Sequence, residues 1–288
     1  MATPLSADRL VAALRAEGIS VHEHSGWRTH NRAGHGAWGP VNGVLIHHTA
    51  GHGDREVCYD GRSDLPGPLC HAWLGKTDGF WMIGNGRANH AGKADSRVLA
   101  QVANESYGTR PVAPGPGDVD GNAVYYGLEI ENLGNGKDPY PSKQYDTAVR
   151  FAAAICRAHG WGAKSVIGHK ESTSQKIDPS FDMPTFRAHV AERLAHPANW
   201  NPKEEDMPLS ADDIAKVWKS DILTSAPEAA ARGNETVTPE TWFTYLGARV
   251  REIKAEVADL RKALPTGGVD MEALADLVVE KIAQRLDR

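Results

Sequence analysis

The 288-residue sequence has few cysteines and no long apolar run. Cys58, Cys70 and Cys156 are too few for a fold built on disulfide bonds in a chain of this length, although a single Cys58–Cys70 bridge remains an alternative. No apolar stretch approaches the roughly 20 residues that cross a bilayer, so we expect no stable membrane insertion. Residues 1–15 lack a basic start followed by an apolar core, so we expect no secretory signal.

The sequence also lacks an excess of positive charge. Its formal net charge is −5, and residues 203–288 carry all of it because residues 1–202 are balanced. This distribution excludes a general attraction to nucleic acid or to anionic membranes. A hydrophobic fraction of 41% suits one large domain or two smaller ones.

One apolar run leads directly into two histidines. Val44-Leu45-Ile46 is followed by His47 and His48, and the β-branched run predicts a buried strand. An α/β sheet usually places its site at the carboxyl ends of strands, and imidazole is the commonest metal ligand. Side chains alternate along a strand, so only one of the two histidines can face such a site. The alternative is a strand end with two surface histidines.

Two further segments offer ligands and acid–base groups. His169 follows the short predicted strand 165–168, and Asp178 lies at the far end of the polar loop that comes next. Two imidazoles and one carboxylate would form a catalytic zinc site with a fourth position left open. Lys176 could point into the same space. Glu129, in the predicted strand 124–132, offers a base if its strand face lines a site rather than solvent.

The remaining patterns predict an ordered α/β region. Apolar residues at helical spacing predict three helices, and Asp78-Gly79 between apolar runs predicts a hairpin. Turn-forming residues predict two loops. The expected helices are 6–17, 141–159 and 184–194, the expected strands are 69–74 and 79–84, and the expected loops are 51–67 and 102–122.

Four motifs appear in a fixed order: VLIHHTAG at 44–51, NHAG at 89–92, YYGLEIEN at 125–132 and GHKESTSQKIDP at 168–179. Together they resemble the zinc-dependent N-acetylmuramoyl-L-alanine amidases, the type-2 amidases related in fold to peptidoglycan recognition proteins. The resemblance spans about residues 20–195. It implies an α/β fold with a central mixed β-sheet flanked by helices. It also implies cleavage of the amide bond between N-acetylmuramic acid and L-alanine by zinc-activated water.

Carried over by position, the resemblance implies that Zn²⁺ is held by His47, His169 and Asp178. It makes Glu129 and Lys176 catalytic residues. His48 and Glu131 are then expected to be supporting neighbours.

The NHAG motif implies that Asn89 and His90 line the substrate groove. The chain departs from the family pattern at Cys70-His71, where some phage relatives have tyrosine before the histidine. This departure makes a tyrosine-assisted mechanism doubtful and places the role of the base on Glu129.

The C-terminal part has a different pattern. We expect a catalytic domain at 1–196, a linker at 197–209 and a small all-α domain at 210–288. Apolar residues from Phe243 to Leu264 recur in steps of three and four, which predicts a heptad helix. A last amphipathic helix is predicted at 271–286. The heptad seam predicts either an intramolecular helical hairpin or self-association. A wall-targeting role for this part is inferred only from its location after the catalytic domain, because it lacks the aromatic repeats of many wall-binding modules.

Residues 203–207 suggest a further product. Their codons can encode a purine-rich ribosome-binding sequence directly before Met207. A shorter chain that begins at Met207 could then assemble with the full chain through the helices. The alternative is a solvated acidic linker.

These patterns favour a peptidoglycan amidase that acts as a phage endolysin, with an actinobacteriophage as the expected source. It would stay in the host cytoplasm until lysis and then act on the cell wall. Three alternatives remain: a bacterial wall-recycling amidase, a non-catalytic peptidoglycan recognition module and a structural assembly protein. All three candidate ligands are present, which argues against the recognition module.

Overall fold

The computed structural model describes residues 2–201, 219, 223–224, 236–263, 275–276 and 278–281. The chain divides into two compact units, Met1–Met207 and Pro208–Arg288. Three predictions concern residues that lie outside the described ones: the internal start at Met207, the linker beyond residue 201 and the beginning of the all-α domain at 210–218. The predicted last helix is described only at 275–276 and 278–281, where the backbone is helical.

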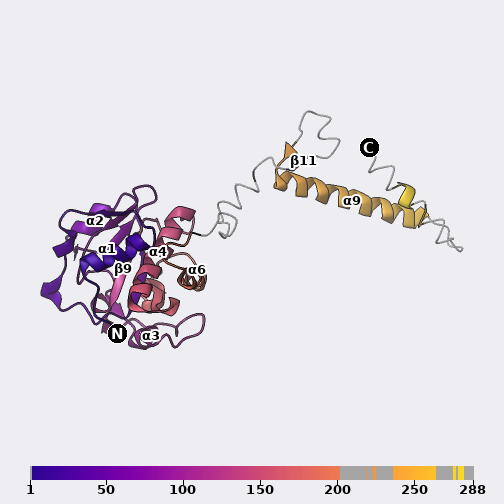
Figure 1. The fold of residues 1–288 in the computed structure, drawn as a ribbon. Helices are drawn as coiled ribbons and strands as arrows, with labels where there is room; N and C mark the ends of the chain where they lie inside the picture. The colour runs from indigo at the N-terminus through magenta and orange to yellow at the C-terminus, as the bar shows by residue number, and fades with distance from the viewer. Residues whose placement is uncertain are drawn as a thin grey trace. The chain divides into compact units, whose positions relative to one another are not determined.

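The first unit combines short strands with helices (Figure 1). In chain order its strands and α-helices are α1 (Ala7–Ala16), β1 (Val21–Glu23), β2 (Gly43–His48), α2 (Arg55–Asp60), β3 (Gly61–Arg62), β4 (Leu65–Pro66), β5 (Ala72–Leu74), β6 (Phe80–Met82), β7 (Lys93–Ala94), α3 (Ser96–Ala103), β8 (Val119–Asp120), β9 (Tyr125–Ile130), α4 (Ser142–His159), β10 (Val166–Gly168), α5 (His169–Ser172) and α6 (Met183–Ala195). Short 3₁₀ turns occupy η1 (Trp27–Thr29), η2 (Ala33–His35), η3 (Gly121–Ala123) and η4 (Ala163–Ser165).

A six-stranded mixed sheet forms the centre of this unit. Its strand order is β1-β6-β5-β9-β2-β10, with β5 and β6 antiparallel and every other neighbouring pair parallel. The predicted central mixed sheet flanked by helices is confirmed. Because β9, β2 and β10 run parallel, their carboxyl ends meet at one edge, which is where parallel sheets usually place a site.

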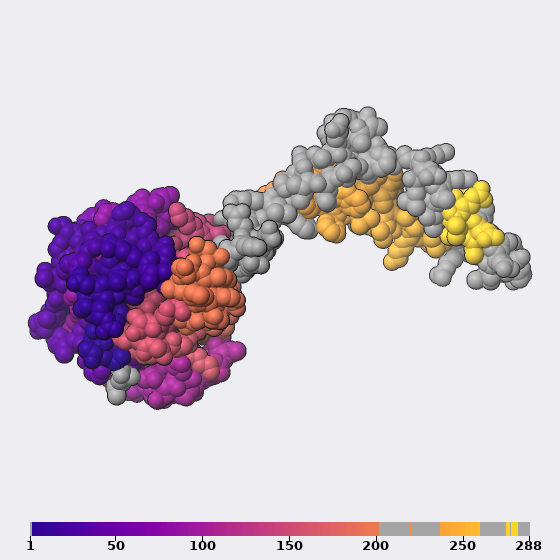
Figure 2. Space-filling model, in the orientation of Figure 1, coloured from indigo at the N-terminus to yellow at the C-terminus, as the bar shows by residue number. Residues whose placement is uncertain are grey.

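The two faces of the sheet carry separate apolar cores. Val44 and Ile46 of β2 belong to the larger core, which includes buried residues of α1, α4 and α6. Leu45 belongs to a smaller core that contains Val98 and Val102 of α3. α6 lies beside α4 on the surface of the unit (Figure 2). Since side chains alternate, His47 shares the α3 face with Leu45.

The predicted helices formed where local signals placed their ends. The Ser6 hydroxyl accepts the Arg9 N–H at the start of α1. Gly160 ends α4 in the left-handed conformation, with φ of 68°. Asp182 caps α6, whose first turn contains Pro184.

The prediction of a polar loop over residues 51–67 was wrong. This segment contains α2 and the small β3–β4 ribbon. Cys58 of α2 is buried in a cluster with Cys70, Trp73 and Ile83. The helix therefore depends on partners elsewhere in the chain, which a local apolar pattern does not reveal. The described cysteines are free thiols.

The second unit is described chiefly by α9 (Pro239–Ala263) and by the pairing of β11 (Leu223–Thr224) with β12 (Thr236–Val237). Several side chains at the predicted heptad positions are exposed. These are Leu246 (41%), Val250 (56%), Ile253 (48%) and Val257 (44%). No described helix in either unit is long and apolar enough to cross a membrane.

Candidate metal centre

The sheet register brings two predicted ligands to one place. His47 lies in β2 opposite Glu129 of β9. On the other side of β2, Ile46 pairs with Gly168 at the end of β10. His169, the next residue, therefore lies beside His47 at the common carboxyl edge.

Three potential ligand atoms converge there. His47 Nδ1 lies 3.0 Å from His169 Nδ1 and 3.1 Å from Asp178 Oδ2, and His169 Nδ1 lies 3.3 Å from the same oxygen. All three residues are buried. Among the described residues, they are the group of three whose donor atoms could hold a metal ion.

The loop after α5 folds back toward the sheet edge and positions Asp178 beside the two histidines. The Lys170 N–H donates to the Asp178 carbonyl at 2.7 Å, and Lys170 Nζ donates to the carbonyls of Pro179 and Phe181. Burial alone would raise the pKa of the Asp178 carboxyl. Close contact with the imidazoles of His169 and His47 outweighs this and holds that pKa below its usual range. Asp178 is therefore a carboxylate at neutral pH.

The other ring nitrogen of each histidine has its own partner. His169 Nε2 lies 3.1 Å from the Ala91 carbonyl oxygen. A carbonyl only accepts, so this nitrogen carries the proton and Nδ1 has the free lone pair. His47 Nε2 lies 3.0 Å from His90 Nδ1. Burial lowers the pKa of His47 to about 4, which leaves a neutral imidazole suited to metal binding.

Glu129 lies at the edge of the same group. Its Oε1 is 4.0 Å from His47 Nδ1, and its side chain is 15% exposed. Oε2 is buried and has no hydrogen-bond partner among the described residues. Burial, followed by repulsion from Asp178, raises the pKa of Glu129 well above its usual value. A carboxyl group that takes up protons readily is suited to acid–base chemistry.

The remaining predicted site residues, Lys176, His90 and Asn89, lie in three different environments. Lys176 is exposed and lies close enough to His47 and Glu129 to affect the pKa of both. His90 is buried behind His47 rather than open to solvent, with 8% exposure. The Asn89 amide donates to the Pro66 carbonyl.

His48 points away from the three candidate ligands. Its Nδ1 lies 3.1 Å from the hydroxyl of Tyr140, which in turn lies 3.1 Å from the Ser180 hydroxyl. Burial lowers the pKa of His48. Tyr140 therefore links His48 to Ser180, which lies two residues after Asp178.

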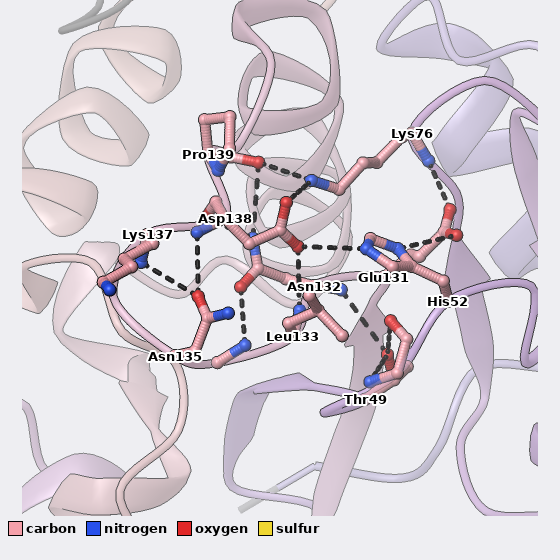
Figure 3. A network of polar contacts seen from close by, with 12 residues as sticks. Thr49, His52, Lys76, Glu131, Asn132, Leu133, Asn135, Lys137, Asp138 and Pro139 are labelled. Carbon is pink, nitrogen blue, oxygen red and sulfur yellow. Dashed lines mark hydrogen bonds and ion pairs between the residues drawn. The ribbon is translucent and has the colours of Figure 1, made fainter.

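A polar network joins the three loops that follow β2, β5 and β9 (Figure 3). The Glu131 carboxylate accepts the N–H groups of Gly53 (2.9 Å) and Lys76 (2.8 Å), and Asp138 pairs with Lys76 Nζ. His52 lies between the two carboxylates, 3.3 Å from Glu131 and 3.6 Å from Asp138. Glu131 thus holds loops together, and Glu129, two residues earlier, faces the site.

The sequence did not reveal several residues that shape this site. Asn122 accepts three backbone N–H groups from residues 90–92, and Tyr140 contacts His48. Neither residue belongs to a motif, and their partners are 30 or more positions away. The only sequence signal was the NHAG motif that Asn122 holds.

A family profile matches the part of the chain that contains this site. The profile of the family described as N-acetylmuramoyl-L-alanine amidase matches residues 37–181, half of the chain. This range contains all three candidate ligands, Glu129 and Lys176. A search of curated proteins found no match.

Solved structures with some likeness include an amidase, an endolysin and a hydrolase. The N-acetylmuramyl-L-alanine amidase AmiD from E. coli, in complex with a substrate, is 14% identical, with 72% of this chain and 75% of that chain covered and a TM-score of 0.39. A mutant endolysin from Bacillus subtilis is 18% identical over 60% and 99% of the two chains, with a TM-score of 0.39. The Staphylococcus aureus hydrolase AmiA is 12% identical over 67% and 93%, with a TM-score of 0.41.

Proposed function

Because this chain belongs to the N-acetylmuramoyl-L-alanine amidase family, we propose that it hydrolyses peptidoglycan at a zinc ion held by His47, His169 and Asp178. The bond cut joins the lactyl carbonyl of N-acetylmuramic acid to the amine of L-alanine. The observation that carries the proposal is the convergence of three buried ligand atoms from separate segments.

The donor set fits zinc. Zn–N and Zn–O bonds of about 2.0–2.1 Å in a tetrahedron place neighbouring ligand atoms about 3.3 Å apart. The three separations are 3.0, 3.1 and 3.3 Å. The three donors would be two imidazole nitrogens with free lone pairs and one carboxylate oxygen. Their negative charge density repels unless a cation lies between them. Three protein ligands leave the fourth position open, as in catalytic zinc sites.

When bound, zinc would activate water and polarise the scissile carbonyl. Glu129 would take a proton from the attacking water and return it to the amine of L-alanine as the C–N bond breaks. Lys176 would stabilise the negative charge that develops on the carbonyl oxygen.

The test combines metal analysis with identification of the bond cut. Purified full-length chain should contain about one zinc per molecule, and digestion of purified walls should release L-alanine amino termini. His169→Ala should lose both properties. His189→Ala is a matched control, because His189 lies on α6 and, among the described residues, its ring forms a hydrogen bond with the Tyr145 hydroxyl alone. Wall binding without new amino termini would instead identify a non-catalytic recognition module.

We further propose that the enzyme serves as a phage endolysin in the host cytoplasm until it is released to the wall. Expression inside a susceptible bacterium should then cause lysis only after the inner membrane is permeabilised. The His169→Ala variant should not lyse cells under either condition. Cleavage of soluble wall fragments but not of intact walls would favour a recycling amidase.

The exposed apolar side chains of α9 support self-association of the C-terminal part. A heptad seam gains stability when it is buried against another helix. In light scattering, Val250→Asp with Ile253→Asp should lower the mass of the assembly that the full chain forms, whereas Arg251→Asp with Lys254→Asp should change that mass less.

The internal start at Met207 has its own test. Synonymous recoding of codons 203–205 should remove a shorter product that starts at Met207.

A further inference from the structure

The segment Asn89–Gly92 lies behind both candidate histidine ligands. His90 Nδ1 is 3.0 Å from His47 Nε2, and the two rings meet edge to face with centroids 5.2 Å apart. The next residue, Ala91, places its carbonyl oxygen 3.1 Å from His169 Nε2. Two consecutive residues thus contact the outer nitrogens of both histidines.

One side chain holds this segment in place. The Asn122 Oδ1 accepts the N–H groups of His90 (2.9 Å), Ala91 (2.8 Å) and Gly92 (3.2 Å). Asn122 lies in η3, directly before β9, and its own N–H donates to Asp120. The segment is therefore anchored to the strand that carries Glu129.

The sheet also leaves room for the His90 ring. A Cβ atom at Gly127 of β9 would overlap the His90 imidazole. His71, on the other side, lies 5.5 Å from His90 between ring centroids. Its two nitrogens contact the Gly127 N–H and the Gly86 carbonyl. His90 is confined between His47 and His71.

We infer that His90 and the Ala91 carbonyl are positioning groups that direct the Nδ1 atoms of His47 and His169 toward the metal, with Asn122 as their anchor. A neutral imidazole binds a metal through one nitrogen only if its proton sits on the other. The Ala91 carbonyl selects this tautomer in His169, and His90 Nδ1 can accept the corresponding proton of His47. Partners of this kind orient metal-bound histidines. This inference rests on the proposed zinc centre and differs from the substrate-groove role that the NHAG motif implied for His90.

The test measures zinc affinity without turnover. Metal-free full-length chain is titrated with zinc in competition with a chromogenic chelator. His90→Leu should raise the zinc Kd about 10- to 100-fold. His90→Asn should recover much of the affinity, because its amide oxygen can occupy nearly the position of Nδ1. His189→Leu removes an imidazole from α6 and should leave the Kd within about twofold of wild type.

A second pair of variants covers the case in which His90→Leu does not fold. Asn122→Ala removes the acceptor for three N–H groups and should weaken zinc binding. Asn122→Asp keeps the acceptor and should weaken it less. In the zinc-loaded protein, long-range ¹H–¹⁵N spectra should show His47 and His169 protonated at Nε2.

The outcomes separate this inference from the proposed metal centre. If wild type binds no zinc, or His169→Ala binds it equally well, the metal centre and the inference both fail. If wild type binds zinc and His90→Leu and Asn122→Ala bind it with unchanged Kd, the inference alone fails. In that case, a raised KM with an unchanged kcat in His90→Leu would assign His90 to the substrate groove.

Discussion

The Nδ1 atoms of His47 and His169 lie 3.0 Å apart, although 122 positions separate these residues in the sequence. The proton of His169 is drawn to Nε2 by the Ala91 carbonyl. Its Nδ1 therefore presents a lone pair to the space that it shares with Asp178 Oδ2. Such an arrangement is stable when a cation occupies that space.

Removal of the metal should destabilise the catalytic unit. A ligand that binds only the folded chain adds about 4 kcal/mol when its concentration is 1,000 times its Kd. A chelator should therefore lower the melting temperature of wild type, and added zinc should restore it. Asp178→Ala should be insensitive to both treatments. An Asp178→Ala variant that zinc stabilises as strongly as wild type would contradict the ligand assignment.

Glu129 should matter for rate and not for stability. Glu129→Gln should keep its zinc and lose about 100-fold or more in kcat. Its free energy of unfolding should not fall, because the substitution removes a buried carboxyl whose Oε2 has no partner among the described residues. Wall-digestion kinetics and urea unfolding measure the two effects.

Glu131→Gln is the matched comparison two residues away. It weakens bonds to the Gly53 and Lys76 N–H groups, so the free energy of unfolding should fall by roughly 1–2 kcal/mol. Equal losses of kcat in the Glu129 and Glu131 variants would contradict the assignment of Glu129 as the base and of Glu131 as a residue that only holds the loops.

Lys176 should contribute to kcat and not to zinc binding or stability. Because its side chain is exposed, Lys176→Ala should leave zinc content and melting temperature unchanged. We expect kcat to fall about 100-fold, the loss typical when one group that stabilises an oxyanion is removed. Lys137→Ala, at another exposed lysine on a neighbouring loop, is the control. A Lys176→Ala variant with wild-type kcat would show that this lysine takes no part in the reaction.

Asp95 should contribute to acid sensitivity. Its carboxylate accepts from Arg97, from the Gly115 N–H and from the first turn of α3, and these bonds lower its pKa below the usual value. The folded chain thus binds this proton more weakly than the unfolded chain. The resulting stability is complete above the unfolded pKa of about 3.9 and declines as the pH falls below it.

Asp95→Asn should therefore cost roughly 1 kcal/mol at neutral pH, and the difference from wild type should shrink toward about pH 3. Urea unfolding at several pH values measures this. Asp64→Asn, at an exposed ion pair with Arg62, should show little difference at any pH. A gap that stays constant with pH would exclude Asp95 as a source of the acid sensitivity.

Local signals in the sequence were sufficient for the longer helices and for the central strands. The Ser6 cap, the left-handed Gly160 and the apolar spacing in 141–159 each act within a few residues, so α1 and α4 formed where they were predicted. The motif order likewise pointed to a peptidoglycan amidase. α2 was missed because its stability comes from burial of Cys58 against distant side chains.

The amino-acid sequence by itself determined that His47 and His48 end a buried strand, but alternation could not say which of them faces the site. The tertiary structure decided it. Val44 and Ile46 pack into the larger core beneath α4, so His47 lies on the opposite face with His169 and Asp178, whereas His48 meets Tyr140. The sequence also could not show that Asn122 holds residues 90–92 behind the site. Such contacts depend on strand register and loop closure, which fix distances between residues far apart in the chain.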